Sequence, residues 1–398
     1  MDIFQKCWDF TKAQEYKERG IYPYFVPIEE NHGPRVKMNG REVIMIGSNN
    51  YLGLTKDPRV VEAATKAIEK FGTSCSGSRF LNGTLELHVE LEQRLAKFVR
   101  KEAAIVMSTG YQTNMGAIST VIDSRAVIFT DRTNHSSIFD GILLGTTLNR
   151  QVAIKRYHHN DMDDLERVIS DADPDRPKLI ITDGVFSMEG DIVKLPRLIE
   201  IARKHNARVY LDDAHGIGVV GDTGRGTMEH YGLFDETDLV MCTFSKSFAS
   251  LGGFVAGKKE VIDYIQHFAR PMIFSAAIPP ANTVAVLTAL DIIEKEPEIV
   301  RRLQQIGRKM REEFKALGFD IGHSETPIVP ILVRDYDKTF EFWKALFDAG
   351  IYTNAVVPPA VPPDRSLLRT SYMATHTDKD LDQVLDTFKK IGKRMGII

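Results

Sequence analysis

The segment TFSKSFASLGGF (243–254) carries a lysine in an unusual setting. Lys246 follows an apolar run, is flanked by small hydroxyl residues and precedes a glycine-rich turn. A lysine at the end of a buried strand can act as an amine nucleophile that condenses with a carbonyl group. An isolated S-K-S is more often a surface loop, so this segment alone does not decide between the two interpretations.

A second group of polar residues stands in LDDAH (211–215), at the end of another apolar run. Alone, D-D-A-H would also suit a helix cap. Taken with Lys246, it fits pyridoxal phosphate. This cofactor needs a lysine amine for a Schiff base and a carboxylate that keeps its pyridine nitrogen protonated, so that the ring accepts electrons. Lys246 and Asp212 can fill these roles, and His215, one helical turn on, could hydrogen-bond the phenolic oxygen.

Two further segments could bind the phosphate group and one face of the pyridine ring. STGYQTN (108–114) follows an apolar run and opens a predicted helix, so the amides near Gly110 and Tyr111 lie at a positive helix end suited to phosphate. A plain Ser/Thr helix cap is the alternative interpretation. TNHSSI (133–138) also follows an apolar run, which places His135 at the same edge, where it could stack on the pyridine ring.

All of these segments follow predicted strands. The strand candidates are residues 103–107, 126–130, 179–183, 207–213, 238–244 and 252–257, and helical patterns such as 85–99 and 195–205 lie between them. This alternation predicts a three-layer α/β/α domain with a mostly parallel sheet, whose functional loops gather at the carboxyl ends of the strands.

The prediction divides the 398 residues into three parts. Residues 1–56 form an N-terminal arm with a hairpin turn at Asn39-Gly40. Residues 57–280 form the large cofactor-binding domain. Residues 281–398 begin with two long helical patterns and form a smaller C-terminal α+β domain.

Composition limits the function further. Hydrophobic residues make up 43% and charged residues 26%, as in an ordinary globular protein, and the net charge of −3 predicts small-molecule partners rather than nucleic acid. Three cysteines without metal-ligand spacing predict a cytoplasmic protein with no metal. The pair His158-His159 is interpreted as a solvated loop. The basic ending KKIGKRMGII is interpreted as a solvated helix, with weak peripheral contact to anionic lipid of the inner membrane as the alternative.

Seven motifs in a fixed order make the chain similar to a known family, the α-oxoamine synthases among the fold-type I pyridoxal-phosphate enzymes. The motifs are SNNYLGL (48–54), STGYQTN (108–114), TDGVFSMEGD (182–191), LDDAHGIGVVG (211–221), TFSK (243–246), FSAAIPPA (274–281) and LRTSYMATHT (368–377). The resemblance covers nearly the whole chain.

The resemblance implies catalytic and cofactor-binding roles. Lys246 would hold the cofactor, Asp212 would pair with the pyridinium nitrogen, and His135 would stack on the ring. His215 and Ser187 would contact the phenolate oxygen. Thr243 and Ser275 would contact the phosphate, and the other cofactor-binding residues would be Ser108, Gly110, Tyr111 and Ser245.

The resemblance also implies how substrate and subunits bind. Ser275 would come from the neighbouring subunit of a homodimer that shares its active sites. Asn49, His135 and Arg369 would bind the amino-acid carboxylate. Arg369 has independent support, because a guanidinium grips a carboxylate with two parallel hydrogen bonds.

Within the family, GTSCSGSRFLNGT (72–84) and YPYF (22–25) are most similar to bacterial serine palmitoyltransferases. That resemblance implies an acyltransferase of sphingolipid biosynthesis, which condenses L-serine with palmitoyl-CoA to 3-ketodihydrosphingosine, CoA and CO2. The alternatives are a glycine C-acetyltransferase or 8-amino-7-oxononanoate synthase, a fold-type I aminotransferase, and an inactive scaffold that pairs with an active subunit. The presence of Lys246, Asp212 and His215 counts against the scaffold.

Overall fold

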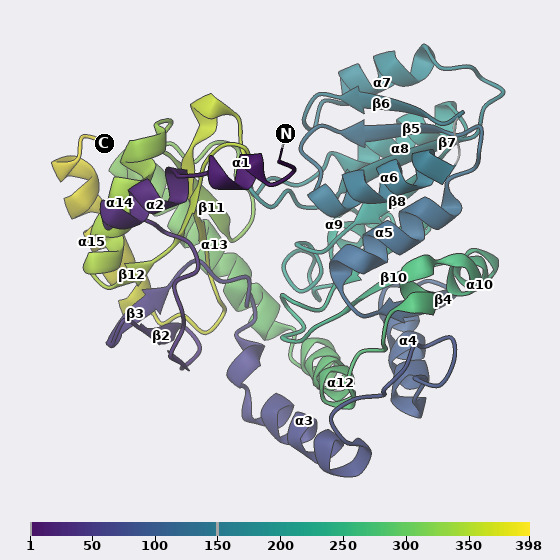
Figure 1. Ribbon diagram of the computed structural model, residues 1–398, viewed down its shortest axis with the longest axis horizontal. Helices are drawn as coiled ribbons and strands as arrows, with labels where there is room; N and C mark the ends of the chain where they lie inside the picture. The colour runs from purple at the N-terminus through teal and green to yellow at the C-terminus, as the bar shows by residue number, and fades with distance from the viewer. Residues whose placement is uncertain (1, 149–150) are drawn as a thin grey trace. The chain divides into compact units, whose positions relative to one another are not determined.

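The computed structural model describes residues 2–148 and 151–398, which form two compact units. One unit comprises Asn49–Gln305, and the other combines Met1–Ser48 with Ile306–Ile398. Figure 1 shows the helices and strands of both.

A seven-stranded sheet forms the centre of the Asn49–Gln305 unit. Its strand order is β4 (Ala103–Met107), β10 (Gly253–Gly257), β9 (Leu239–Thr243), β8 (Ala207–Asp212), β7 (Lys178–Asp183), β5 (Val127–Asp131) and β6 (Ala153–Tyr157). Strand β10 runs antiparallel to both of its neighbours, whereas the strands from β9 to β6 are parallel. The mostly parallel sheet predicted from the sequence is confirmed.

The sequence pattern predicts no strand over Ala153–Tyr157, which is β6. This strand lies at the edge of the sheet, and three of its five residues are exposed. Edge strands commonly carry charged side chains, here Lys155 and Arg156, which discourage pairing with another chain. A strand of this kind has no apolar run to mark it.

Helices flank both faces of the sheet, as the predicted three-layer arrangement requires (Figure 1). The helices of this unit are α3 (Pro58–Phe71), α4 (Glu86–Phe98), α5 (Gly110–Val121), α6 (Ser136–Leu148), α7 (Met162–Ser170), α8 (Leu195–Lys204), α9 (Thr227–Tyr231), α10 (Lys259–Phe268), α11 (Arg270–Phe274) and α12 (Pro280–Lys295), with the short 3-10 helix η1 (Leu54–Lys56). A core that includes Ile118 of α5, Ile138 of α6 and Ile262 of α10 packs on Ile181 of the sheet. Burial of these apolar side chains fixes the helices that open at the carboxyl edge.

The other unit contains two small sheets. One has the order β1 (Glu30–Asn31), β2 (Arg35–Met38), β3 (Arg41–Met45) and β12 (Ile351–Tyr352), and the other has the order β11 (Ile328–Leu332), β14 (Leu367–Ser371) and β13 (Asn354–Val356). Its helices are α1 (Gln5–Trp8), α2 (Lys12–Glu18), α14 (Tyr336–Asp348) and α15 (Asp378–Arg394), with the 3-10 helix η2 (Pro363–Arg365). Helix α13 (Glu298–Leu317) begins in one unit and ends in the other.

The predicted hairpin turn joins β2 to β3. Met38 pairs with Arg41, and the two residues between them, Asn39 and Gly40, have φ values of 50° and 73°. Positive φ at both central positions is the geometry of a tight type I′ turn, which Asn-Gly favours.

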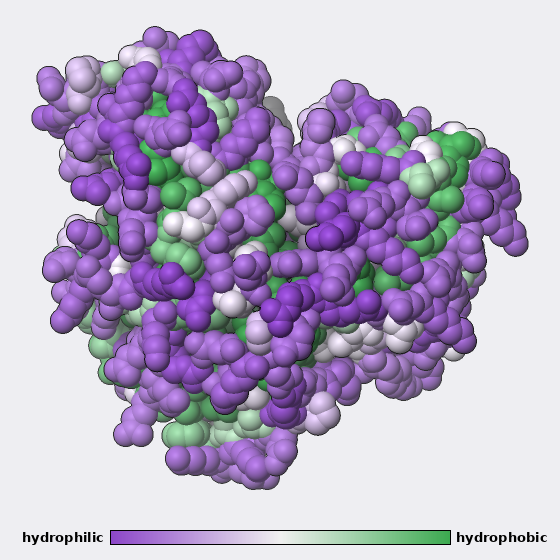
Figure 2. All heavy atoms as spheres, turned by 180° about the vertical axis from the view of Figure 1, so that it is seen from behind, coloured by the Kyte–Doolittle hydropathy of each residue, from purple (hydrophilic) through white to green (hydrophobic). Residues whose placement is uncertain are grey.

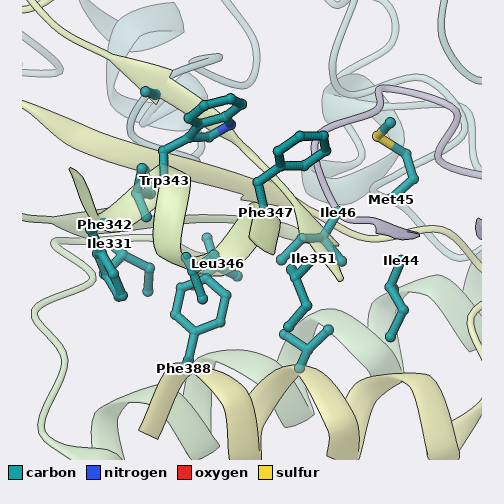
Figure 3. Close-up of a cluster of buried hydrophobic side chains, with 14 of the residues drawn as sticks. Ile44, Met45, Ile46, Ile331, Phe342, Trp343, Leu346, Phe347, Ile351 and Phe388 are labelled. Atoms are coloured by element: carbon teal, nitrogen blue, oxygen red, sulfur yellow. The ribbon is translucent and has the colours of Figure 1, made fainter. Parts of the chain in front are cut away.

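One hydrophobic core joins the N-terminal and C-terminal segments of this unit. Figure 3 shows Ile44, Met45 and Ile46 lying among side chains of α14, α15 and the neighbouring strands. The labelled partners are Ile331, Phe342, Trp343, Leu346, Phe347, Ile351 and Phe388. The first 48 residues therefore fold with the last part of the chain.

Hydrophilic residues cover most of the face shown in Figure 2, and hydrophobic residues appear there in smaller patches. Within residues 2–148 and 151–398, no helix combines the length and the apolar character needed to cross a membrane.

Candidate active site

A cavity of ≈ 280 Å³ opens at the carboxyl ends of the parallel strands, close to the lower end of the roughly 300–1,000 Å³ usual for small-molecule sites. Nine of the residues singled out in the sequence line it: Gly110, Tyr111, His135, Ser187, Asp212, His215, Thr243, Ser245 and Lys246. They come from segments far apart in the chain, and the strand ends bring them together.

Asp212 is the last residue of β8 and is 3% exposed. Its Oδ2 accepts a hydrogen bond from Nδ2 of Asn114 at 2.6 Å, and its Oδ1 accepts one from the amide of Ala214 at 3.1 Å. The Tyr210 hydroxyl donates to Oδ1 of Asn114 at 2.9 Å, which fixes the orientation of that amide. These neutral donors hold the carboxylate and leave lone pairs for a charged ring nitrogen.

His135 precedes α6 and is exposed to the cavity. Its Nδ1 lies 2.7 Å from Oγ of Ser137, and Ser137 in turn accepts a hydrogen bond from Asn114 at 2.8 Å. The backbone amide of His135 donates to Oδ2 of Asp183 at 3.0 Å. The ring is thus held by the same network that orients Asp212.

The surroundings of the cavity shift the pKa values of two groups near Asp212, His135 and Asp183. Partial burial lowers the pKa of His135, Asp212 opposes this effect, and the charge of Lys246 adds to it. Burial and the nearby Asp212 raise the pKa of Asp183 well above its usual range. The cavity therefore disfavours the charged forms of both the His135 imidazole and the Asp183 carboxyl.

His215 faces the cavity and is paired with a fully buried tyrosine, Tyr51. The Tyr51 hydroxyl lies 2.7 Å from Nδ1 of His215 and 3.3 Å from Oδ1 of Asn49. These two contacts hold the ring of His215 in place at the wall of the cavity.

Helix α5 meets the sheet closely at one end of the cavity. A Cβ atom on Gly110 would lie 2.6 Å from Oγ1 of Thr243, so only glycine allows this approach. Oγ1 of Thr243 also lies 2.9 Å from Oγ of Ser245. Backbone amides at the start of α5 and these hydroxyls form the donor set that phosphate groups prefer.

Lys246 lies three residues after β9, in a turn fixed by backbone hydrogen bonds. The amide of Phe244 donates to the carbonyl of Gly252 at 2.8 Å, and the amide of Ala249 donates to the carbonyl of Lys246 at 3.1 Å. The half-buried lysine is therefore presented to the cavity from a rigid segment.

These residues fit pyridoxal phosphate. The close approach of Gly110 to Thr243 creates a phosphate-binding end, while Asp212 offers a buried carboxylate for the ring nitrogen. Lys246 supplies the amine in the same cavity. The chemistry of this donor set matches the phosphate, the ring nitrogen and the aldehyde of the cofactor.

Four of the predicted site residues lie outside this cavity. Ser108 donates from Oγ to the carbonyl of Ala276, and Ser275 accepts a hydrogen bond from Nε2 of Gln112 at 3.2 Å. Asn49 is half-buried beside Tyr51. Arg369 lies on β14 of the other unit, is 4% exposed and contacts Oγ of Ser371 at 3.5 Å. Their roles stay predictions.

The sequence analysis gave no role to Asn114, Ser137 or Asp183, which also line the cavity. Asp183 ends β7 directly beside Asp212, and Asn114 lies one helical turn after Gly110 on α5. Their places inside the quoted motifs, at a strand end and in the first turns of helices, are the signal that could have found them.

The interpretation of His158-His159 as a solvated loop is wrong for the second residue. The side chain of His158 is 58% exposed, but that of His159 is only 25% exposed and lies between the buried carboxylates of Asp131 and Asp191. Adjacent side chains point in opposite directions after a strand, so one sequence label cannot describe both.

Comparisons with known proteins identify the family of this chain. Residues 41–388 match the family described as aminotransferase class I and II. A serine palmitoyltransferase of Sphingobacterium spiritivorum is 47% identical, with 99% of this chain and 98% of that protein covered. An 8-amino-7-oxononanoate synthase of Thermoanaerobacter pseudethanolicus is 42% identical, with 97% of each covered.

Comparison with solved structures also identifies a serine palmitoyltransferase as similar to this chain. A solved serine palmitoyltransferase from S. paucimobilis, with a bound PLP-myriocin aldimine, matches with a TM-score of 0.96 and 35% identity, and each chain is covered to 100%. The chain therefore belongs to the aminotransferase class I and II family and, within it, to the α-oxoamine synthases.

Proposed function

We propose that this chain is a pyridoxal-phosphate-dependent serine C-palmitoyltransferase. It would condense L-serine with a long-chain acyl-CoA such as palmitoyl-CoA and release CoA and CO2, giving 3-ketodihydrosphingosine. One observation carries the proposal: Lys246, Asp212 and a phosphate-suited helix start share one cavity, in a chain that is 47% identical to a serine palmitoyltransferase over almost its full length.

When bound, pyridoxal phosphate supplies an electron-accepting ring for the negative charge that develops on serine Cα. Nζ of Lys246 is the amine that would hold it covalently. Asp212 would keep the proton on the ring nitrogen, supported by Asn114 at 2.6 Å. His215 and Ser187 would contact the phenolate oxygen.

The phosphate would be held by the start of α5 and by hydroxyl groups. The amides of Gly110 and Tyr111 stand at the N-terminus of α5, where the helix dipole favours a negatively charged group. Thr243 and Ser245, 2.9 Å apart, would add hydroxyl donors. We keep Ser108 in this shell on the family resemblance alone.

Lys246 would also move the proton in the condensation. When it is not bound to the cofactor, Nζ of Lys246 would be the base that accepts the proton from serine Cα. Asn49, His135 and Arg369 would bind the serine carboxylate and orient the Cα–H bond for removal of its proton. His135 would cover one ring face in its neutral form.

We further propose a homodimer in which Ser275 reaches the phosphate of the neighbouring subunit. In support, Ser275 lies outside the cavity of its own chain. The residue before it, Phe274, is 78% exposed, as is Leu81, and the bridge between Ser78 and Ala276 joins their two segments. Exposed apolar side chains on adjoining segments suit burial against a second copy.

We retain a cytoplasmic location in the proposal. The weak peripheral membrane contact of the C-terminal helix has less support, because Phe388 and Ile391 of α15 are buried in the core of their own unit. Those side chains are not available to lipid.

Product mass spectrometry after supplying serine with palmitoyl-CoA tests the proposed reaction. The expected product retains the serine hydroxymethyl group and loses the serine carboxyl carbon as CO2. An 8-amino-7-oxononanoate synthase is the second candidate, favoured by the 42% identical relative. Turnover only with alanine or glycine and a shorter acyl-CoA would support that class of activity, and amino transfer without CO2 release would indicate an aminotransferase.

A further inference from the structure

His159 lies just after β6 and is held between two buried carboxylates. Its Nε2 is 3.2 Å from Oδ2 of Asp191, and its Nδ1 is 3.4 Å from Oδ1 of Asp131. Oγ1 of Thr133 lies 2.7 Å from Nδ1 and donates its own proton to Asp131 at 2.9 Å. Both ring nitrogens therefore face acceptors, and this arrangement requires a proton on each.

The surroundings favour a charged ring. Burial alone lowers the pKa of His159, but hydrogen bonds and charge interactions with Asp131 and Asp191 raise it to about 10. The side chains of the two acids are 0% and 7% exposed, so water screens them little. Asn160 adds neutral donors, from its amide to Asp131 at 2.6 Å and from Nδ2 to Asp191 at 2.8 Å. Asp183 and Tyr157 also interact electrostatically with Asp131.

The two carboxylates begin and end loops that carry cavity residues. Asp131 ends β5, and its Oδ1 accepts from the amide of Thr133 at 2.8 Å, in the loop that leads to His135. Asp191 ends the loop that carries Ser187, where the amide of Phe186 donates to the Asp191 carbonyl at 3.1 Å.

His159 also packs against the second loop. Its ring meets Phe186, the neighbour of Ser187, edge to face at a centroid distance of 4.4 Å. The residue thus contacts both loops, through charged hydrogen bonds to one and through charge and packing to the other.

We propose that His159 is a positioning residue, whose imidazolium ties the loop of residues 131–135 to the loop of residues 186–191. It thereby fixes His135 and Ser187 at the cavity without touching the cofactor or the substrate itself. The tie between the two loops involves only residues of this chain. Its effect on cofactor binding, through His135 and Ser187, rests on the proposed function.

Hydrogen exchange measured on the cofactor-free protein tests the tie directly. The glutamine of His159→Gln is neutral and cannot reach both Asp131 and Asp191 with N–H donors. We therefore expect amide exchange to rise about tenfold or more in both loops. His158→Gln is the matched control, because His158 is exposed and pairs with Asp164. Unchanged exchange in the two loops, or an equal rise throughout the unit, would overturn the proposal.

A second variant separates charge from packing. His159→Gln leaves two buried carboxylates without their cation, so adding Asp191→Asn to it removes one charge and is expected to restore part of the slow exchange. No recovery would mean that the ring acts only through its shape. If His159→Gln fails to fold, ¹⁵N NMR of histidine in the unaltered protein decides: two protonated ring nitrogens at pH 8 are expected, and a neutral ring overturns the proposal.

The cofactor gives an independent readout. Pyridoxal phosphate titrated into the apo-protein is expected to bind about tenfold more weakly to His159→Gln than to the unaltered chain or to His158→Gln. If amide exchange rises in the two loops but pyridoxal phosphate binds to His159→Gln as tightly as to the unaltered chain, the positioning role is overturned. If pyridoxal phosphate binds none of the three proteins, the proposed function fails, whereas the exchange result still decides the tie.

Discussion

The hydroxyl of Tyr51 lies 2.7 Å from Nδ1 of His215, and this contact holds the histidine ring at the wall of the cavity. Tyr51 is fully buried and belongs to the motif SNNYLGL (48–54), more than 160 residues before His215 in the chain. A ring that is held in advance by a buried hydroxyl needs no rearrangement when a ligand arrives.

Tyr51→Phe removes this hydrogen bond and little volume. We expect the protein to fold and to bind cofactor, but turnover falls about fivefold or more, because one neutral hydrogen bond is worth about 1 kcal/mol. The visible spectrum of the bound cofactor should also change its pH dependence. Tyr264→Phe, which alters an exposed tyrosine of α10, is the control. A spectrum and a turnover equal to the control would refute the role of Tyr51.

Lys246→Ala removes the amine that would hold the cofactor. Borohydride reduction followed by intact-mass measurement is expected to add the cofactor mass to the unaltered protein and to Lys258→Ala, an exposed-lysine control, but not to Lys246→Ala. A cofactor mass that stays attached to Lys246→Ala would identify a different lysine.

Asp212→Asn tests the carboxylate beside the ring nitrogen. Asparagine keeps the size and can still accept from Ala214, so the cofactor is expected to stay bound. Without a negative charge to hold the ring proton, turnover should fall by about 10²-fold or more. Cofactor content and turnover measured on the same sample check this, and undiminished turnover would exclude the assignment.

Asp213 predicts a pH dependence of stability. Burial raises the pKa of its carboxyl to about 7, against hydrogen bonds from the hydroxyl and amide of Thr227. A raised folded-state pKa in an acid means that the folded protein binds more protons than the unfolded chain. Stability from this group is therefore greatest at low pH and falls as pH rises from about 4 to about 7.

Asp213→Asn should remove that fall. The variant is expected to be more destabilised relative to the unaltered protein at pH 5 than at pH 8, as measured by denaturant unfolding at both values. A destabilisation that is the same at the two pH values would show that Asp213 does not titrate in this range.

Arg369→Ala tests the carboxylate clamp. Loss of a charge-assisted contact worth about 2 kcal/mol corresponds to a serine affinity roughly thirtyfold weaker. Arg369→Lys keeps the charge but not the two-pronged geometry, so we expect an intermediate affinity. Serine titrations of the cofactor-loaded proteins measure both, and thermal melting controls for the burial of Arg369. An affinity unchanged in Arg369→Ala would remove it from the substrate site.

The sequence predicted the large sheet and most of the cavity because both depend on local signals. Lys246, Asp212 and Thr243 each follow an apolar run, and parallel strands bring their carboxyl ends to one edge. Strand β6 was missed because an exposed edge strand has no such run. His159 was misjudged for a related reason: its two acids come from the end of β5 and from the loop after β7, and no spacing in the sequence reveals this.

Long-range packing was equally hidden from the sequence. Periodicity shows that Ile44 and Trp343 are core residues of their own elements, but not that they share one core. In the same way, the sequence shows Asn114 only as a residue of a predicted helix. The fold reveals that its side-chain amide donates a hydrogen bond to Asp212.

The shared core of Met1–Ser48 and Ile306–Ile398 has a consequence for synthesis on the ribosome. The Asn49–Gln305 unit is uninterrupted and can acquire its structure while translation continues. The opening hairpin, in contrast, leaves the exit tunnel with Ile44 and Ile46 uncovered, and nearly three hundred more residues must be translated before Trp343 can cover them. During that interval the uncovered apolar side chains of the hairpin expose the nascent chain to aggregation.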